Sequence, residues 1–221
     1  ENLSKVKRDN NIKVTLENDW VRVSELTSGC ARKLFYRLSQ DSKSKNKENF
    51  DLNSTFRMNI GSKVHEYMQE TFGDYLENVE ERFFCDELKV SGQIDGAKFN
   101  PNNPQEQFLV DFKIVGVNTY VIFNKMNKAK KDYKRQMMWY IYLYNQKYNT
   151  NITKGYLFFV NRNVDVYFNS YRNFDFNTHL REVELWKNHG RNQTFKIFEV
   201  NFDEEEFAEE VMNLMNVRNR V

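Results

Sequence analysis

Residues 107–115, with the sequence Gln-Phe-Leu-Val-Asp-Phe-Lys-Ile-Val, decide the fold of this chain. The apolar run over 108–110 predicts a buried, central strand. Alternate side chains of a strand share a face, so Asp111 and Lys113 point one way and Phe112 points the other way, into the core. A carboxylate and an ammonium group at the end of an apolar strand are costly to bury unless each has a partner or a task. The same strand therefore indicates both a core and a candidate site.

Further elements are expected on both sides of this strand, from hydrophobic periodicity and turn residues. Ser24 is the expected N-cap of the first helix, and residues 39–54 are expected to form a mobile loop. Upstream we expect helices over 25–38 and 55–76, strands over 80–90 and 91–99 joined at Ser91-Gly92, and a turn at 101–104. Downstream we expect a helix over 131–148, strands over 152–160 and 164–171, and helices over 177–189 and 203–217. This order of elements predicts a mixed α/β fold.

The composition fits one domain over residues 1–221. Hydrophobic residues make up 40% of the chain, which can supply a sizeable core. We expect that core over about 55–171, preceded by a helix and loop over 1–54 and followed by helices over 172–221. The net charge is only +2, from 33 basic and 31 acidic residues, so any basic surface must be local.

The chain contains two cysteines and no apolar run long enough to cross a bilayer. Cys30 and Cys85 make a disulfide framework improbable and suit a reducing compartment. No secretory signal is visible at the start of the sequence. We therefore expect no membrane partner and a cytoplasmic location in a bacterial or phage-infected cell, with a nucleus or organelle left open.

Asp95 is a second acidic residue that a neighbouring strand could bring to Asp111. Two converging carboxylates suit a hard divalent cation such as Mg²⁺. Such a cation lowers the pKa of a bound water and stabilises charge on a phosphodiester. Lys113 could orient that water or stabilise the developing charge. The alternative is a salt bridge between Asp111 and Lys113 at the end of the strand.

Four short motifs occur in order along the chain. They are Gly61-Ser62-Lys63-Val64-His65-Glu66, Gly92-Gln93-Ile94-Asp95, Asp111-Phe112-Lys113 and Gln136-Met137-Met138-Trp139-Tyr140. This order of GxxxHE, GxxD, (D/E)xK and QxxxY resembles the RecB-like branch of the PD-(D/E)XK nuclease superfamily, which includes CRISPR-associated and phage-encoded exonucleases. The resemblance spans about Ser24 to Val160. It implies a restriction-endonuclease-like core, with a central mixed β-sheet flanked by helices and extra N- and C-terminal helices.

The resemblance also implies roles for the motif residues. His65, Asp95 and Asp111, with the backbone carbonyl of Phe112, would bind one or two Mg²⁺ or Mn²⁺ ions, and the histidine favours Mn²⁺. Lys113 would be the catalytic lysine. As an alternative, His65 would be an ordinary helix histidine.

Gln136 and Tyr140 lie four residues apart and therefore share one helix face. The resemblance implies that they position the DNA phosphate or the catalytic lysine. Tyr140 stands among other aromatic residues in the sequence, and packing in the core is the alternative role for it.

The segment around Cys30 also resembles the family. Ser24-Glu25-Leu26, Cys30-Ala31-Arg32-Lys33 and Tyr36 match the N-terminal stretch of the CRISPR-associated exonucleases, in which the cysteine holds an iron–sulfur cluster with three others. This chain has one further cysteine only, so no iron–sulfur cluster is expected. We expect Cys30 to be a small buried apolar residue instead.

DNA binding requires cations near the site. The first candidates precede or open the QxxxY helix, and they are Lys130, Lys131, Lys134 and Arg135. Arg32 and Lys33 are the second candidates. The alternative for both groups is an ordinary solvated helix face.

These patterns predict a metal-dependent DNA nuclease. We expect it to be an exonuclease acting in recombination, repair or phage replication, on DNA that is single-stranded or has a free end. A homo-oligomer, or a partner protein of recombination or replication, is left open. The alternatives are a catalytically silent nucleic-acid-binding module and an RNA endonuclease of the cap-snatching type.

Overall fold

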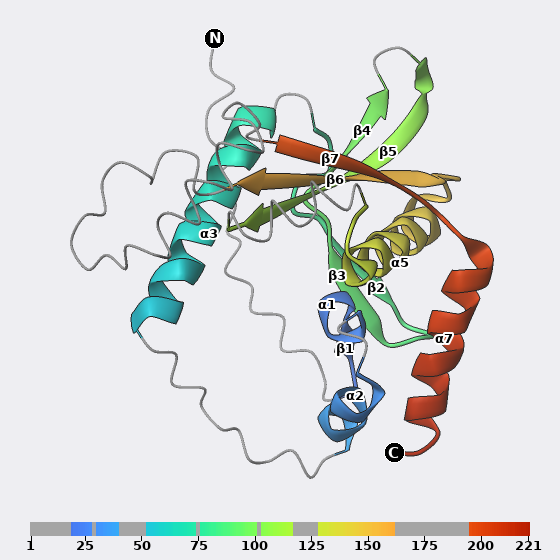
Figure 1. The fold of residues 1–221 in the computed structure, drawn as a ribbon. Coiled ribbons are helices and arrows are strands. Elements are labelled where there is room, and N and C mark those ends of the chain that lie inside the picture. Colours follow the sequence, from blue (N-terminus) through green and yellow to red (C-terminus); the bar gives the residue numbers. More distant parts are fainter. Residues whose placement is uncertain are drawn as a thin grey trace.

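The fold is described from a computed structural model, which describes residues 19–27, 30–39, 52–73, 76–100, 103–116, 128–161 and 195–221. Its strands are β1 (Val21–Arg22), β2 (Arg82–Cys85), β3 (Val90–Gln93), β4 (Gly96–Asn100), β5 (Asn103–Val115), β6 (Lys154–Asn161) and β7 (Phe195–Asn201). Its helices are α1 (Val23–Leu26), α2 (Ala31–Leu38), α3 (Leu52–Phe72), α5 (Lys131–Tyr148) and α7 (Glu204–Arg218). Figure 1 shows α3 and α7 at opposite ends of the larger sheet, and α5 below the strands of that sheet.

The strands form two sheets, in the orders β1-β3-β2 and β4-β5-β6-β7. In the larger sheet β5 and β6 are parallel and the other neighbours are antiparallel. Strand β5 has a neighbour on each side, which confirms the central strand expected from residues 108–110. The α/β class and the mixed sheet are also as expected.

The larger sheet is covered on both faces, and alternate side chains of β5 pack into two different cores. Leu109 packs into the core that contains the buried residues of α5, whereas Val110 and Phe112 pack with Met68 of α3. Helix α5 has the expected bounds, and its buried residues include Met137, Met138, Trp139, Ile141 and Leu143. The two helices therefore lie on opposite faces of β5, as a strand buried on both faces requires.

The N-terminal helix differs from the expectation. It is divided into α1 and α2, and Arg22 and Cys30 are their N-caps, in place of the expected Ser24. The Sγ atom of Cys30 accepts a hydrogen bond from the backbone N of Lys33 at 3.4 Å. Cys30 is exposed, so the expectation of a buried cysteine was wrong. Its thiol satisfies a free N–H group in the first turn of α2.

Several boundaries also differ. The β2–β3 hairpin turns at 86–89, where Lys89 has a φ of 47°, and not at Ser91-Gly92. Strand β5 includes Asn103 and Pro104, which were expected in a turn. Helix α3 begins at Leu52, inside the expected loop, and ends earlier than expected.

The C-terminal part was predicted incompletely. Helix α7 was expected, and Asp203 caps it by accepting a hydrogen bond from Glu206 N. Strand β7 was missed. The expected strand over 164–171, the expected helix over 177–189 and nearly all of residues 1–19 and 39–51 lie outside the described residues. No helix in the described ranges is both long and apolar enough to cross a membrane.

Gly155 sets the distance between α5 and β6. A Cβ atom at this position would lie 2.3 Å from Met137 Sδ and 2.8 Å from Met137 Cγ. Met137 is fully buried, so it has little room to move away. A side chain at position 155 would push the helix from the sheet that carries Asp111.

We expect Gly155→Ala to lower the free energy of unfolding by about 1–3 kcal/mol through overpacking. Gly61→Ala is the matched control, because Gly61 lies inside α3 and nothing lies within 4 Å of an added Cβ. That change should stabilise the helix by up to about 1 kcal/mol. Urea unfolding of both variants measures the difference, and equal stability of Gly155→Ala and the wild type would contradict the close packing.

Candidate active site

Three elements bring the acidic motif residues and the histidine together. His65 projects from α3, Asp111 and Lys113 belong to β5, and Asp95 lies in the bend between β3 and β4. The sequence expectation had placed Asp95 within a strand. The bend frees its carboxylate from the alternation of a strand, so that it can contact α3 and β5 at once.

Asp95 links α3 to β5. Its Oδ1 atom lies 3.0 Å from His65 Nε2, and its Oδ2 atom accepts a hydrogen bond of 2.6 Å from the backbone N of Phe112. The hydrogen bond from His65 to Asp95 raises the pKa of the imidazole, against the effect of burial. The carboxylate thus fixes the position of His65 relative to the strand that carries Asp111.

Asp111 and Lys113 form an ion pair at the end of β5. The distance between Lys113 Nζ and Asp111 Oδ2 is 2.6 Å, and the two side chains are 15% and 5% exposed. This Oδ2 atom is buried without a hydrogen bond of good geometry, so the ammonium compensates its charge but leaves the oxygen unsatisfied. Burial raises the pKa of Asp111, and the Asp95 charge raises it further, while Lys113 lowers it.

The donor set fits a divalent cation by its chemistry. Two carboxylates and an imidazole suit Mn²⁺ and Mg²⁺, and the Asp111 oxygen without a hydrogen bond keeps a lone pair that a metal ion could accept. Among the described residues, no three His, Cys, Asp or Glu side chains are already arranged as a metal-binding group. His65 contacts Asp95 and Lys113 contacts Asp111, so metal binding would replace these two pairs.

The Phe112 ring packs against the imidazole of the site and against α3. It lies edge-to-face against His65, with centroids 6.2 Å apart, and stacks on Phe72 at 5.9 Å. The ring therefore supports the imidazole from the core side of the sheet. The expected role of its backbone carbonyl stays a prediction.

Gln136 and Tyr140 lie on one buried face of α5, as their spacing predicts. The amide of Gln136 donates a hydrogen bond of 2.6 Å to the Tyr140 hydroxyl. Burial raises the pKa of Tyr140, and the charges of Asp111 and Asp95 raise it further. The pair therefore lies near the carboxylates but is bonded to itself, and Tyr140 is also part of the core.

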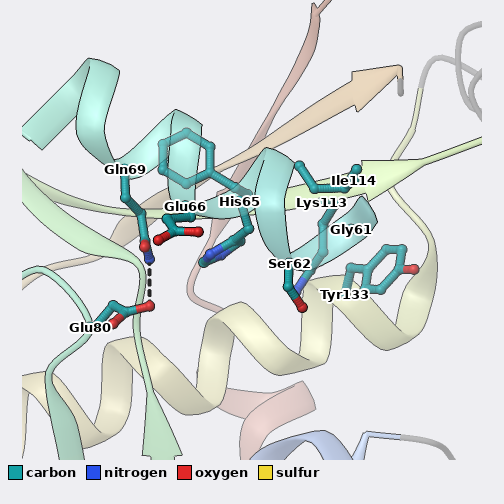
Figure 2. Close-up of a pocket in the computed structure, with 10 residues that line it drawn as sticks. Gly61, Ser62, His65, Glu66, Gln69, Glu80, Lys113, Ile114 and Tyr133 are labelled. Carbon is teal, nitrogen blue, oxygen red and sulfur yellow. Dashed lines mark hydrogen bonds between the residues drawn. The ribbon is translucent and has the colours of Figure 1, made fainter. Parts of the chain in front are cut away.

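A cleft of about 590 Å³ opens beside these pairs. His65 and Lys113 line it, while their carboxylate partners lie behind them. Figure 2 shows further polar side chains around the same space, including Gln69, whose amide donates a hydrogen bond of 2.9 Å to Glu80. Glu80 was missed in the sequence because its turn carries no motif, although its φ of 55° is unusual for a non-glycine residue.

Some of the cations expected to bind DNA form ion pairs with acidic residues, and others are exposed. Lys134 pairs with Glu206 at 2.5 Å and Arg135 with Glu210 at 2.8 Å, so both hold α7 against α5. Lys130 pairs with Asp132 in its own helix turn, and Lys131 is exposed. The second group, Arg32 and Lys33, is exposed on α2, and neither residue lines the cleft.

Tyr140 also borders a second, smaller cavity. Its volume is about 200 Å³, and Arg22, Arg82 and the half-exposed ring of Phe84 line it. These two arginines were not singled out in the sequence, because neither belongs to a basic run. They provide positive charge beside Tyr140, and neither belongs to the two groups of cations expected to bind DNA.

The arrangement of sheets and helices has counterparts among solved structures. The chain shares the fold of two solved exonucleases. A phage-related exonuclease from Haemophilus somnus 129PT matches with a TM-score of 0.53 and 15% identity, over 91% of this chain and 92% of that one. An alkaline exonuclease from Laribacter hongkongensis matches with a TM-score of 0.55 and 12% identity, over 92% and 88%.

The likeness confirms the fold expected from the RecB-like resemblance. At these identities it concerns the fold, and the roles of single residues have to be argued from their own contacts. No protein-family model matches the sequence, and no curated protein matches it.

The α5–α7 ion pairs predict that Arg135 contributes to stability. Arg135 and Glu210 are 20% and 10% exposed, so Arg135→Ala leaves a largely buried carboxylate without its partner. We expect a loss of about 1–2 kcal/mol in the free energy of unfolding. Lys130→Ala is the control, because this pair is 54% and 31% exposed and should change stability by less than about 0.5 kcal/mol. Equal denaturation midpoints for the two variants would refute the role in holding α7.

Proposed function

We propose that the chain is a metal-dependent DNA nuclease that acts as an exonuclease. The observation that carries the proposal is the cleft wall formed by His65 and Lys113, each backed by a carboxylate. A binding module has no physical need for a buried Asp111 beside Lys113, because a charge held out of water costs free energy unless it has a task. The exonucleases that share the fold support this class of activity.

The residues would divide the work as follows. His65, Asp95 and Asp111 would hold one or two divalent ions, which lower the pKa of an attacking water and neutralise phosphate charge. Lys113 would place its ammonium against a phosphate oxygen and stabilise the charge that develops there. Asp95 orients His65, and Phe112 excludes water behind the imidazole. Gln136 and Tyr140 would hold the phosphate near Lys113.

The substrate would be DNA that is single-stranded or has a free end, in recombination, repair or phage replication. One neighbour is described as a phage-related exonuclease, which agrees with such a setting. Arg22 and Arg82 would add positive charge beside Tyr140. Phosphate contacts of this kind give affinity without base specificity.

The first experiment is a cleavage assay with end-labelled single-stranded DNA, double-stranded DNA and RNA, each with Mn²⁺, with Mg²⁺ and with EDTA. The proposal expects cleavage of DNA that EDTA abolishes. Cleavage of RNA alone would instead indicate an RNA endonuclease, and binding of DNA without cleavage would indicate a silent module.

In the same assay Asp111→Asn should leave no measurable cleavage and an essentially unchanged melting temperature. The amide keeps the shape of the carboxyl and removes a charge that burial disfavours. Asp132→Asn is the control, because Asp132 is an acid of α5 that lies outside the cleft. Mn²⁺ binding by calorimetry should weaken in Asp111→Asn and Asp95→Asn, and unchanged binding in both would place the metal elsewhere.

Lys113→Ala should separate chemistry from binding. We expect the single-turnover rate to fall by about two to three orders of magnitude, with Mn²⁺ and DNA affinities retained, because its charge acts in the transition state. Lys147→Ala is the matched control, since Lys147 also pairs with a carboxylate and lies over an aromatic ring, outside the cleft. A rate near that of the wild type would reduce Lys113 to an ion-pair partner of Asp111.

A further inference from the structure

Tyr133 forms part of the wall of the active-site cleft, although it precedes the QxxxY motif and belongs to none of the four motifs. Figure 2 shows its ring on the same side of the cleft as Lys113. Tyr133 lies in the first turn of α5, and its backbone N donates a hydrogen bond of 3.0 Å to Lys130 O. The first turn of a long, buried helix therefore fixes the backbone from which the Tyr133 ring projects.

The ring is also fixed against the sheet. Its centroid lies 5.5 Å from that of Phe159, at an interplanar angle of 62°. Phe159 is fully buried and is the partner of Lys113 in the parallel register of β5 and β6. Tyr133 consequently packs over β5 and β6, at the position where Lys113 projects from β5.

The face of the ring meets the ammonium group of Lys113. The distance from Lys113 Nζ to the ring centroid is 5.1 Å, within the range of a cation–π contact. The same Nζ atom lies 2.6 Å from Asp111 Oδ2. The ammonium group is thus held between a carboxylate on one strand and an aromatic face on the helix.

We propose that Tyr133 is a positioning residue for Lys113. A lysine side chain is a point charge on a flexible four-carbon stem, and one carboxylate does not fix its direction. The ring of Tyr133 restricts the ammonium group to the cleft wall when the carboxylate turns to another cation. The proposal rests on the nuclease function proposed above, and it adds a residue to that site.

Lys130 is the other cation near this ring, at 5.8 Å from the centroid. Its ammonium is more than half exposed and pairs with Asp132, whereas Lys113 is 15% exposed. A cation–π contact is stronger for a desolvated cation than for a hydrated one. The ring therefore acts mainly on Lys113.

The test compares Tyr133→Phe, which keeps the aromatic face, with Tyr133→Leu, which keeps only apolar volume. Single-turnover cleavage is measured at saturating DNA and Mn²⁺. Tyr133→Leu should be roughly three- to thirtyfold slower, and Tyr133→Phe should be within about twofold of the wild type. DNA affinity should not change. Tyr142→Leu is the matched control, since Tyr142 is a half-buried ring on the same helix that packs on Trp139 and Phe207, outside the cleft.

A second readout does not need activity. In NMR spectra, the ring current of Tyr133 should shift the Lys113 ε-methylene protons, which Lys113→Ala identifies. The shift should persist in Tyr133→Phe and disappear in Tyr133→Leu. Its absence from the wild type would overturn the placement of the ring, even if Tyr133→Leu failed to fold.

Two rate results would overturn the positioning role. The first is a Tyr133→Leu rate equal to that of the wild type, and the second is a Tyr133→Phe rate as low as that of Tyr133→Leu, which would assign the effect to the hydroxyl. A wild-type protein that cleaves no nucleic acid but shows the ring-current shift would instead remove the proposed function and leave the Tyr133–Lys113 contact standing.

Discussion

The Asp111 carboxylate lies in a place from which water is almost absent, so the elements around it must compensate its charge. Burial alone would favour the protonated acid. Lys113 supplies the compensating charge from the same strand face, and one oxygen of Asp111 still has no hydrogen bond. The backbone that carries the pair is held on one side by the register with β6 and on the other by the hydrogen bond from Phe112 N to Asp95.

The second constraint is that α3 must not move relative to this strand. Two kinds of contact prevent it, one polar and one apolar. Asp95 reaches both His65 and the backbone of Phe112, and the Phe112 ring packs on Phe72 of α3. The polar contact sets the direction of the His65 side chain, and the apolar contact sets the distance between α3 and β5. His65 and Asp111 can therefore keep a fixed separation, which a site assembled from three elements needs.

The parts of the fold that could be predicted are those in which local sequence and tertiary environment agree. Strand β5 is buried on both faces and α5 is buried over most of its length, so the apolar residues of each mark it in the sequence. Their motif residues followed, because spacing alone places Asp111 beside Lys113 and Gln136 beside Tyr140. The hydrogen bond between Gln136 and Tyr140 could not be predicted, since it depends on rotamers set by the core.

The missed features have weak or misleading local signals. The β2–β3 turn contains no glycine, and Lys89 adopts its positive φ only within the hairpin. Strand β7 exposes Ile197 on its outer face, which breaks the expected alternation. The break before α2 depends on a cysteine acting as a cap, a role for which serine or aspartate is usual. The partners of Lys134 and Arg135 come from α7, far along the chain, and periodicity carries no information about them.

The parallel pairing of β5 with β6 has a consequence for synthesis of the protein on the ribosome. Lys113 pairs in register with Phe159, so the strand that carries the acid and the lysine gains this neighbour only after α5 and β6 have been made. Non-local pairings of this kind form late and slowly. A nascent chain that ends before β6 therefore carries the motif residues without the scaffold that aligns them. Such a chain would lack the aligned pair of Asp111 and Lys113 that the proposed nuclease activity requires until the sheet has closed.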